Sequence, residues 1–191
     1  MIRQYEPSDE QGWLRCRVLS FLDTAYFDSV EREKEQYDRP AIELVAEEEG
    51  EVVGLLDIEC EEEPGTVCSD RPGLAGMIWH VAVHPDHRRR GVGAALLDRA
   101  EELARERDLV RLEAWTRDDP WVLAWYASRG FECVDSYLHV YIDRGGEGAL
   151  QSTIEGLRPA RTFAHYVGTD GNAMRTRFER VHDCNLLERR L

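Results

Sequence analysis

The chain has 191 residues, of which 42% are hydrophobic and 32% charged, so it has enough apolar material for the buried core of one domain. Its 24 basic and 38 acidic residues give a net charge of −14, which disfavours nucleic acid and anionic membranes as partners. The longest apolar runs fall far short of the ~20 residues that cross a bilayer, and the first residues lack the features of an export signal. We therefore expect a cytoplasmic protein that binds neither nucleic acid nor membrane.

Cysteine and lysine usage narrow the chemistry further. The five cysteines are odd in number and widely spaced, without a C-x-x-C pair, which predicts neither a disulfide framework nor a metal site. Lys34 is the only lysine among the 24 basic residues. GC-rich coding can explain why arginine is used in place of lysine, but it does not explain the excess of acidic residues. That surplus fits either a salt-loving source, where molar salt screens the repulsion between carboxylates, or simply an acidic bacterial protein.

The spacing of apolar residues predicts alternating strands and helices, which is typical of an α/β or α+β fold. In the first half we expect a strand at residues 2–5, a helix from Ser8 or Asp9 to Leu22, a more polar helix at 30–37 ended by Pro40, and a hairpin of strands 42–46 and 52–60 that turns at Gly50.

The second half begins with a strand at 74–83, which is apolar on both faces and is therefore expected at the centre of the sheet. An amphipathic helix at 93–107 follows it. The remaining predicted elements are a strand at 110–115, a helix at 120–128, a strand at 131–142, a strand at 162–167, a helix at 172–180 and a last strand at 183–189.

The segment between the central strand and the amphipathic helix carries the clearest chemical signal. Three consecutive arginines, Arg88, Arg89 and Arg90, precede Gly91 and Gly93 at the start of the helix. Glycines allow backbone N–H groups to turn toward a ligand, and the positive end of the helix dipole lies at the same place. The loop therefore predicts a pyrophosphate site. It has neither the P-loop pattern nor the Gly-x-Gly-x-x-Gly of dinucleotide folds, so a ligand other than ATP or NAD is indicated.

Two motifs resemble the GNAT superfamily of N-acetyltransferases. The family's acetyl-CoA loop, Arg or Gln-x-x-Gly-x-Gly or Ala, is similar to Val83-x-Pro85-x-x-Arg88-x-x-Gly91-x-Gly93. The family's Asn-x-x-Ala-x-x-Phe-Tyr-x-x-x-Gly-Phe helix is similar to Asp119-Pro120-x-x-x-Ala124-Trp125-Tyr126-x-x-x-Gly130-Phe131. The resemblance implies a mixed, mostly antiparallel sheet flanked by helices, formed by a single domain over residues 1–191. It also marks residues 144–181, before the last strand, as an atypical extension.

The resemblance also implies roles for individual residues. The central strand would pair with the pantetheine arm of acetyl-CoA and the loop would hold its pyrophosphate, through Val81, Ala82, Val83, Arg88, Arg89, Arg90, Gly91, Val92, Gly93 and Ala94. Asp119 would cap its helix first and contact CoA second. Tyr126 occupies the position of the family's acid, whose phenol protonates the departing sulfur. The alternative is a tyrosine that only packs in the core.

A general base is harder to identify. The family often places a carboxylate on the central strand, but no Asp or Glu lies between Gly73 and Val83. His80 can accept a proton directly or through water, or it is a core histidine without a chemical role. Glu113 on the next strand is a second candidate, with a cross-sheet pair as its alternative role.

Together these features predict an N-acetyltransferase that moves an acetyl group from acetyl-CoA to a primary amine by direct attack, without a metal. The competing hypothesis is a non-catalytic acyl-CoA-binding or sensing module, which the missing strand carboxylate favours. The acceptor cannot be read from the sequence, although a net charge of −14 gives a small preference to cationic amines. A homodimer is left open.

Overall fold

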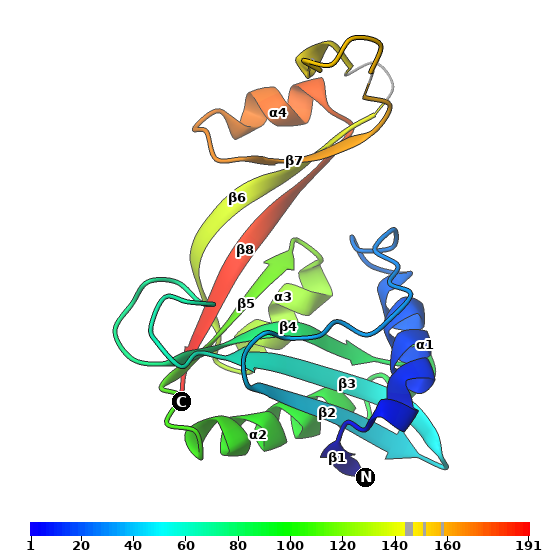
Figure 1. Ribbon diagram of the computed structural model, residues 1–191, viewed down its shortest axis with the longest axis vertical. Helices are drawn as coiled ribbons and strands as arrows, with labels where there is room; N and C mark the ends of the chain where they lie inside the picture. Colours follow the sequence, from blue (N-terminus) through cyan, green and yellow to red (C-terminus); the bar gives the residue numbers. More distant parts are fainter. Residues whose placement is uncertain (144–146, 151, 158) are drawn as a thin grey trace.

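The computed structural model describes residues 1–143, 147–150, 152–157 and 159–191. Its strands are β1 (Ile2–Gln4), β2 (Ala41–Glu48), β3 (Glu51–Cys60), β4 (Ala75–Val83), β5 (Arg111–Arg117), β6 (Glu132–Ile142), β7 (Thr162–Tyr166) and β8 (Arg180–Arg190). Its helices are α1 (Glu10–Phe21), α2 (Val92–Arg105), α3 (Pro120–Ser128) and α4 (Gly171–Arg177), with short 3-10 turns η1 (Pro7–Asp9), η2 (Pro85–His87) and η3 (Glu147–Ala149) (Figure 1). Within the described part of the chain, no helix is both long and apolar enough to pass through a bilayer.

The strands form one eight-stranded sheet in the order β1-β2-β3-β4-β5-β8-β6-β7. β4 and β5 are parallel neighbours, whereas the other neighbouring pairs in this order are antiparallel. This arrangement confirms the predicted mixed, mostly antiparallel sheet flanked by helices. It also confirms that the apolar strand β4 lies inside the sheet rather than at an edge.

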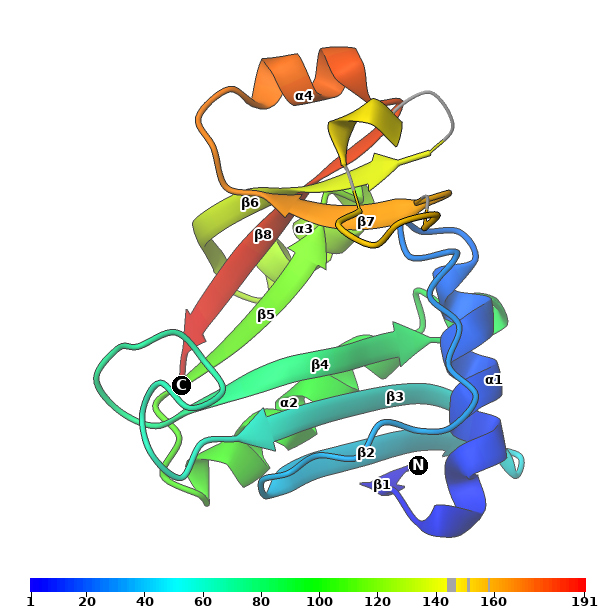
Figure 2. The same cartoon turned by 45° about the horizontal axis from the view of Figure 1, so that its top comes forward.

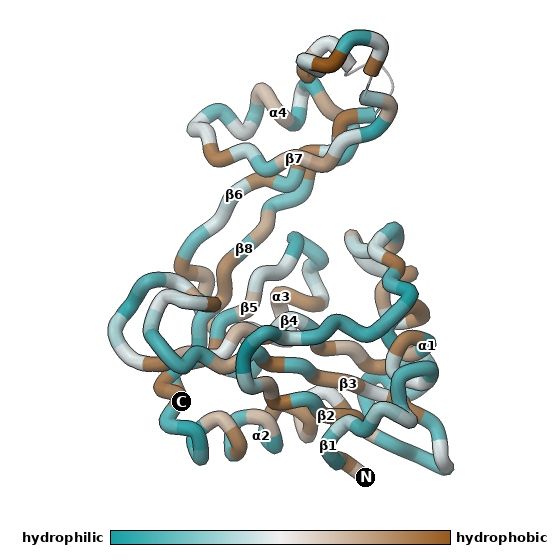
Figure 3. Tube along the Cα trace, in the orientation of Figure 1, coloured by the Kyte–Doolittle hydropathy of each residue, from teal (hydrophilic) through white to brown (hydrophobic). Residues whose placement is uncertain are grey.

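Helices α1 and α2 cover opposite faces of the first half of the sheet. Successive strand residues point to opposite faces, so Leu55 packs with Trp13 of α1, whereas Leu56 packs with Leu96 of α2. Along α2 the hydropathy alternates as expected for a helix with one buried side, while β3 is apolar over much of its length (Figure 3). The predicted amphipathic helix is therefore confirmed, and it packs on one face of β3 while α1 packs on the other.

An irregularity in β4 opens the middle of the sheet. Asp57 of β3 is opposite His80, but the next residue, Ile58, is opposite Ile78, so Trp79 is an extra residue that bulges from β4. β4 then pairs with β5 only from Ala75 to Met77. Beyond that point the two strands diverge, and Figure 2 shows a wedge between them. The later part of β4 therefore has backbone groups without a β5 partner.

The segment between α1 and β2 corrects one prediction. No helix forms at residues 30–37. Neighbouring side chains are instead bound to different parts of the sheet: Lys34 pairs with Asp57, Glu35 contacts His80, and the Tyr37 hydroxyl donates to Asp57 at 3.1 Å. These contacts hold the segment across the sheet in an irregular path, because they are stronger than the modest helix preference of a polar stretch.

The C-terminal part forms a projecting arm. β6 and β8 extend beyond the body of the sheet and carry β7 and α4 at their far end (Figure 1). Leu138, Val140, Ile142 and Phe178 form a separate small core there. The predicted strand at 162–167 is confirmed, but α4 ends at Arg177 and β8 begins at Arg180, because pairing with β6 extends the chain from that residue. Residues 144–146, 151 and 158 of the predicted extension lie outside the described residues.

Candidate active site

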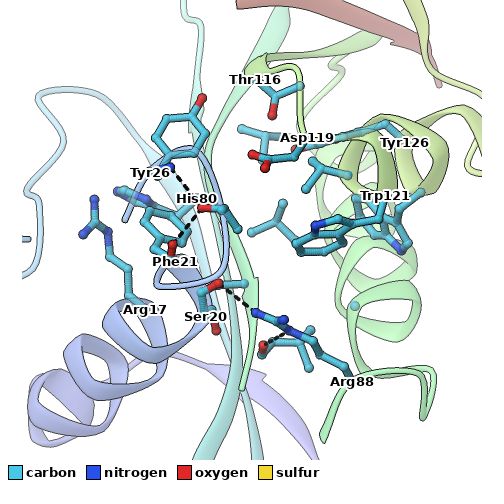
Figure 4. Close-up of a pocket in the computed structure, with 18 of the residues that line it drawn as sticks. Arg17, Ser20, Phe21, Tyr26, His80, Arg88, Thr116, Asp119, Trp121 and Tyr126 are labelled. Carbon is cyan, nitrogen blue, oxygen red and sulfur yellow. Dashed lines mark hydrogen bonds between the residues drawn. The ribbon is translucent and has the colours of Figure 1, made fainter. Parts of the chain in front are cut away.

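The wedge between β4 and β5 contains a cavity of about 1110 Å³. Residues 77–83 of β4 form its floor, and the end of α1, the loop before α2 and helix α3 form its walls (Figure 4). Most of the sequence-predicted site residues come together here: Val81, Ala82, Val83, Arg88, Arg89, Gly91, Val92, Gly93, Ala94, Asp119, Tyr126 and His80 line the cavity. Arg90 and Glu113 are not among the lining residues.

The loop between β4 and α2 is built to receive an anion. Arg89 and Gly91 both have left-handed backbones, with φ of 60° and 85°, and Gly91 is the N-cap of α2 without a side-chain cap. Consecutive N–H groups in such a turn point inward, and the first N–H groups of a helix have no partner of their own. Gly93 has no positive φ, and a Cβ there would make ordinary contacts with Val83 and Trp125. The conformational requirement for glycine therefore lies at Gly91 alone.

Arg88 braces the mouth of the cavity. Its guanidinium donates to the carbonyl oxygen of Ser20 at 2.8 Å and to that of Val83 at 3.4 Å, and it lies 5.1 Å from the centre of the Trp121 ring (Figure 4). Asp23 is its nearest carboxylate, at 3.4 Å. Arg88 therefore joins the end of α1 to the end of β4, and its charge stays at the cavity. Arg90 is exposed.

Asp119 corrects the expected helix cap. It stands at the N-cap position of α3, but its side chain makes no capping hydrogen bond. Its two carboxylate oxygens instead accept the backbone N–H of Ala25, at 3.1 and 3.0 Å. The loop that contains Ala25 passes over the cavity, and the Asp119 carboxylate turns toward it because the Ala25 N–H would otherwise have no acceptor. Asp119 thereby ties residues 22–29 to the opposite wall.

Tyr126 lies on α3 with its side chain buried, and the edges of the Trp125 and Phe131 rings pack around it. Burial raises the pKa of its phenol above the ordinary value. The group is therefore protonated at neutral pH, which is the state that a proton donor requires.

His80 is the chemically unusual residue of the cavity floor. It is 8% exposed, and its Nε2 is 3.0 Å from a carboxylate oxygen of Glu35. The hydrogen bond with His80 lowers the pKa of Glu35, so the carboxylate is ionised and Nε2 carries the donated proton. Nδ1 is buried and has no partner among the described residues. A buried lone pair without a partner is rare in folded proteins and is available to accept a proton.

Glu113 is a correction. It is 0% exposed and accepts hydrogen bonds from the backbone N–H and hydroxyl of Ser69 and from Nε of Arg111. Burial alone would raise the pKa of Glu113, but these donors outweigh it and lower the pKa. Its oxygens are occupied and it is not among the residues that line the cavity, so its role is structural. Its partners are a loop serine and Arg111 of its own strand, not the cross-sheet partner that was its alternative. It fastens the loop before β4 to β5.

This arrangement of sheet, wedge and glycine turn defines an acyl-group transferase, and comparisons with known proteins agree. The sequence profile of the acetyltransferase (GNAT) family matches residues 8–131. Acetyltransferase SG1711 of Sodalis glossinidius (strain morsitans) is 32% identical over 127 residues, which are 66% of this chain and 80% of that protein.

Solved structures share the fold. The ribosomal-protein-S18-alanine N-acetyltransferase from Escherichia coli superposes with a TM-score of 0.60 and 16% identity, over 100% of this chain and 92% of its own. The PaiA N-acetyltransferase from Thermoplasma acidophilum, solved in complex with coenzyme A, gives a TM-score of 0.59 and 10% identity, over 100% of this chain and 98% of its own. The chain belongs to the acetyltransferase (GNAT) family and is an acyltransferase.

Proposed function

We propose that this enzyme moves the acetyl group of acetyl-CoA to a primary amine by direct attack of the amine on the thioester. The observation that carries the proposal is the wedge between β4 and β5, because it brings Gly91, His80 and Tyr126 to one cavity. The rival hypothesis of a non-catalytic acyl-CoA sensor rested on the missing strand carboxylate. Glu35 supplies a carboxylate to His80 from another segment, so that reason no longer stands.

The cavity suits acetyl-CoA at two points. The uncapped start of α2, with Arg89 and Gly91 in left-handed turns, offers several N–H groups to a pyrophosphate. The part of β4 beyond Met77 lacks a β5 partner, so Val81 and Val83 have backbone groups for the amides of a pantetheine arm. The PaiA neighbour from Thermoplasma, solved with coenzyme A, supports this use of the fold. When bound, acetyl-CoA supplies the activated acetyl group.

His80 and Tyr126 would handle the protons of the reaction. As the amine nitrogen bonds to the carbonyl carbon and the carbon–sulfur bond breaks, one proton leaves the amine and one is needed by the sulfur. Nδ1 of His80 accepts the first, since Nε2 already donates to Glu35. The Tyr126 hydroxyl donates the second, because burial keeps it protonated. Glu35 is a positioning residue that fixes the ring and its tautomer.

The experiment that tests the proposal measures CoA release from acetyl-CoA with a panel of amines, beside calorimetry of acetyl-CoA binding. We expect Gly91→Val to weaken acetyl-CoA affinity at least about tenfold, or ~1.4 kcal/mol, because a branched residue disfavours φ of 85° and would reorient the N–H groups. The matched control is Gly50→Val, where φ is 84° and a Cβ also meets open space, but in the β2–β3 turn. Equal affinities in both variants would contradict the assigned pyrophosphate site.

The contact between Glu35 and His80 predicts an effect on turnover. The hydrogen bond with His80 lowers the pKa of Glu35, so the carboxylate is ionised and holds the ring through Nε2. Glu35→Gln replaces this charged acceptor with a neutral amide, so kcat should fall about tenfold while KM for acetyl-CoA stays the same. This variant leaves the other charged groups near the pair unchanged. They are Asp57 opposite His80, and Lys34 and Arg17 beside Glu35.

The control for this prediction is Glu33→Gln, which removes an exposed carboxylate from the same segment. It should leave kcat at the value of the unmodified enzyme. If both variants keep that kcat, or both lower it equally, then Glu35 does not act on His80 and the contact is only structural.

A further inference from the structure

The charged residues of the cavity have the opposite sign to the protein as a whole. The chain carries a net charge of −14, yet the cavity lining contains four arginines and one carboxylate, Asp119. Asp119 already accepts the N–H of Ala25 with both oxygens. A polycationic acceptor such as a polyamine would therefore meet positive charge and no available carboxylate in this lining. The small preference for cationic amines drawn from the net charge does not extend to the cavity.

One of the four arginines lies away from the predicted pyrophosphate turn. Arg88 and Arg89 belong to the loop before α2, and Arg129 pairs with Asp98 at the end of α3. Arg17 instead comes from α1, and Figure 4 shows it on the same side of the cavity as His80, apart from Arg88. Its charge is thus at the end of the cavity where the amine would be deprotonated.

Arg17 is a buried cation whose hydrogen bonds go to neutral acceptors. It is 3% exposed, and it donates to the carbonyl oxygen of Ser29 at 2.8 Å and to the Ser29 hydroxyl at 3.3 Å, both neutral acceptors. The nearest carboxylate, Glu31, is 4.0 Å away and half exposed. Nε of Arg17 is buried without a partner among the described residues. Burial lowers the pKa of Arg17, and the nearby carboxylates of Glu31 and Glu35 offset this cost of desolvation only in part.

The free edge of Arg17 has the shape of a carboxylate site. Nε is unpartnered, and Nη2 has a long hydrogen bond to the Ser29 hydroxyl and lies 4.0 Å from Glu31. The side of the guanidinium that carries these two donors is the side that binds a carboxylate through two parallel hydrogen bonds. The centre of the Phe21 ring lies 4.6 Å from the guanidinium carbon, close enough for a cation–π contact. Phe21, Tyr26 and Trp115 are neutral aromatic side chains of the same cavity lining.

We infer that the acceptor is a small amino acid-like molecule, an amine that also bears a carboxylate, which Arg17 holds while His80 takes the proton from the amine. The inference rests on the proposed acetyl transfer and narrows its acceptor. It predicts that removal of the carboxylate from an acceptor costs more than any change in its apolar part, because a charged hydrogen-bond pair is lost.

The test compares acceptors that differ only in the carboxylate: phenylalanine with phenethylamine, and leucine with isoamylamine. Spermidine is measured beside them as a polycationic acceptor. CoA release should give a kcat/KM about tenfold to hundredfold higher for the better amino acid than for its decarboxylated partner, with spermidine no better than the amines. Arg17→Met keeps an apolar stem of similar length and should remove most of that difference by raising KM for the amino acid, with KM for acetyl-CoA unchanged.

Equal kcat/KM for both members of each pair, or a preference for spermidine, overturns the carboxylate inference and leaves acetyl transfer standing. Acetyl-CoA binding without CoA release from any amine instead overturns the proposed function. In that case calorimetry tests the carboxylate site without any turnover. N-acetylphenylalanine and N-acetylphenethylamine are titrated into the CoA-loaded enzyme, and their affinities are compared. Tighter binding of the acid supports Arg17 as a carboxylate site, and equal or absent binding contradicts it, whether or not Arg17→Met folds.

Discussion

Tyr126→Phe should lower kcat by about 10²- to 10⁴-fold while acetyl-CoA affinity and the melting temperature change little. The substitution keeps the ring that packs between Trp125 and Phe131 and removes only the hydroxyl. Because burial raises the pKa of this phenol, it is protonated throughout the neutral range and can give its proton to the departing sulfur. The loss corresponds to about 3 to 5 kcal/mol of transition-state stabilisation, far more than an ordinary hydrogen bond contributes.

The measurement needs an acceptor for which chemistry limits turnover, since slow product release would hide the effect. Tyr5→Phe is the matched control, because it deletes a hydroxyl from a tyrosine on the α1 side of the sheet, outside the cavity lining. Its kcat should equal that of the unmodified enzyme. If Tyr126→Phe kept more than about a third of kcat under these conditions, another group or water would be the acid.

Lys34→Met should destabilise the fold by about 3 to 5 kcal/mol, the usual cost of leaving one member of a buried ion pair alone. Lys34 is 7% exposed, and its Nζ is 3.0 Å from Asp57, which is 0% exposed. Burial alone would lower the pKa of Lys34, but Asp57 and Glu43 outweigh it and raise the pKa, so the ammonium is charged. The rings of Tyr5, Trp13 and Tyr37 surround it at 4.9 to 5.3 Å.

Denaturant unfolding of Lys34→Met checks this value. Arg39→Met is the control on the same segment, since Arg39 is partly exposed and 3.8 Å from Glu59, and it should cost no more than ~1 kcal/mol. A loss below ~1 kcal/mol in Lys34→Met would mean that Asp57 is protonated or hydrated in the native state. The only lysine of the chain would then have no special role in stability.

The glycine turn before α2 and the order of the first elements could be predicted because their signals are local. Gly91 must adopt a positive φ at a helix start, and the apolar stripe of α2 and the two-sided burial of β4 are visible within short windows. The position of Tyr126 followed from one short motif. These are features in which neighbouring residues determine the structure.

The partner of His80 could not be predicted in this way. Glu35 lies 45 residues earlier in the chain, and its segment looked helical because nothing local shows that Asp57 and His80 hold it across the sheet. Arg17 was overlooked for the same reason, since on α1 it is one polar residue among several until the loop with Ser29 covers it. The Trp79 bulge, which opens the wedge, depends on the pairing of two strands and has no sequence signal of its own.

The position of β8 has a consequence for biosynthesis. This strand lies between β5 and β6 in the sheet, although it follows every other strand in the chain. At the ~5–20 residues per second of translation, the ribosome therefore leaves the open edges of β5 and β6 without their shared neighbour for several seconds. Unpaired strand edges of this kind can pair with other nascent chains and aggregate. A chaperone that covers these edges therefore has its largest effect just before β8 emerges from the ribosome. A stop codon ahead of β8 would separate the arm from the body of the enzyme.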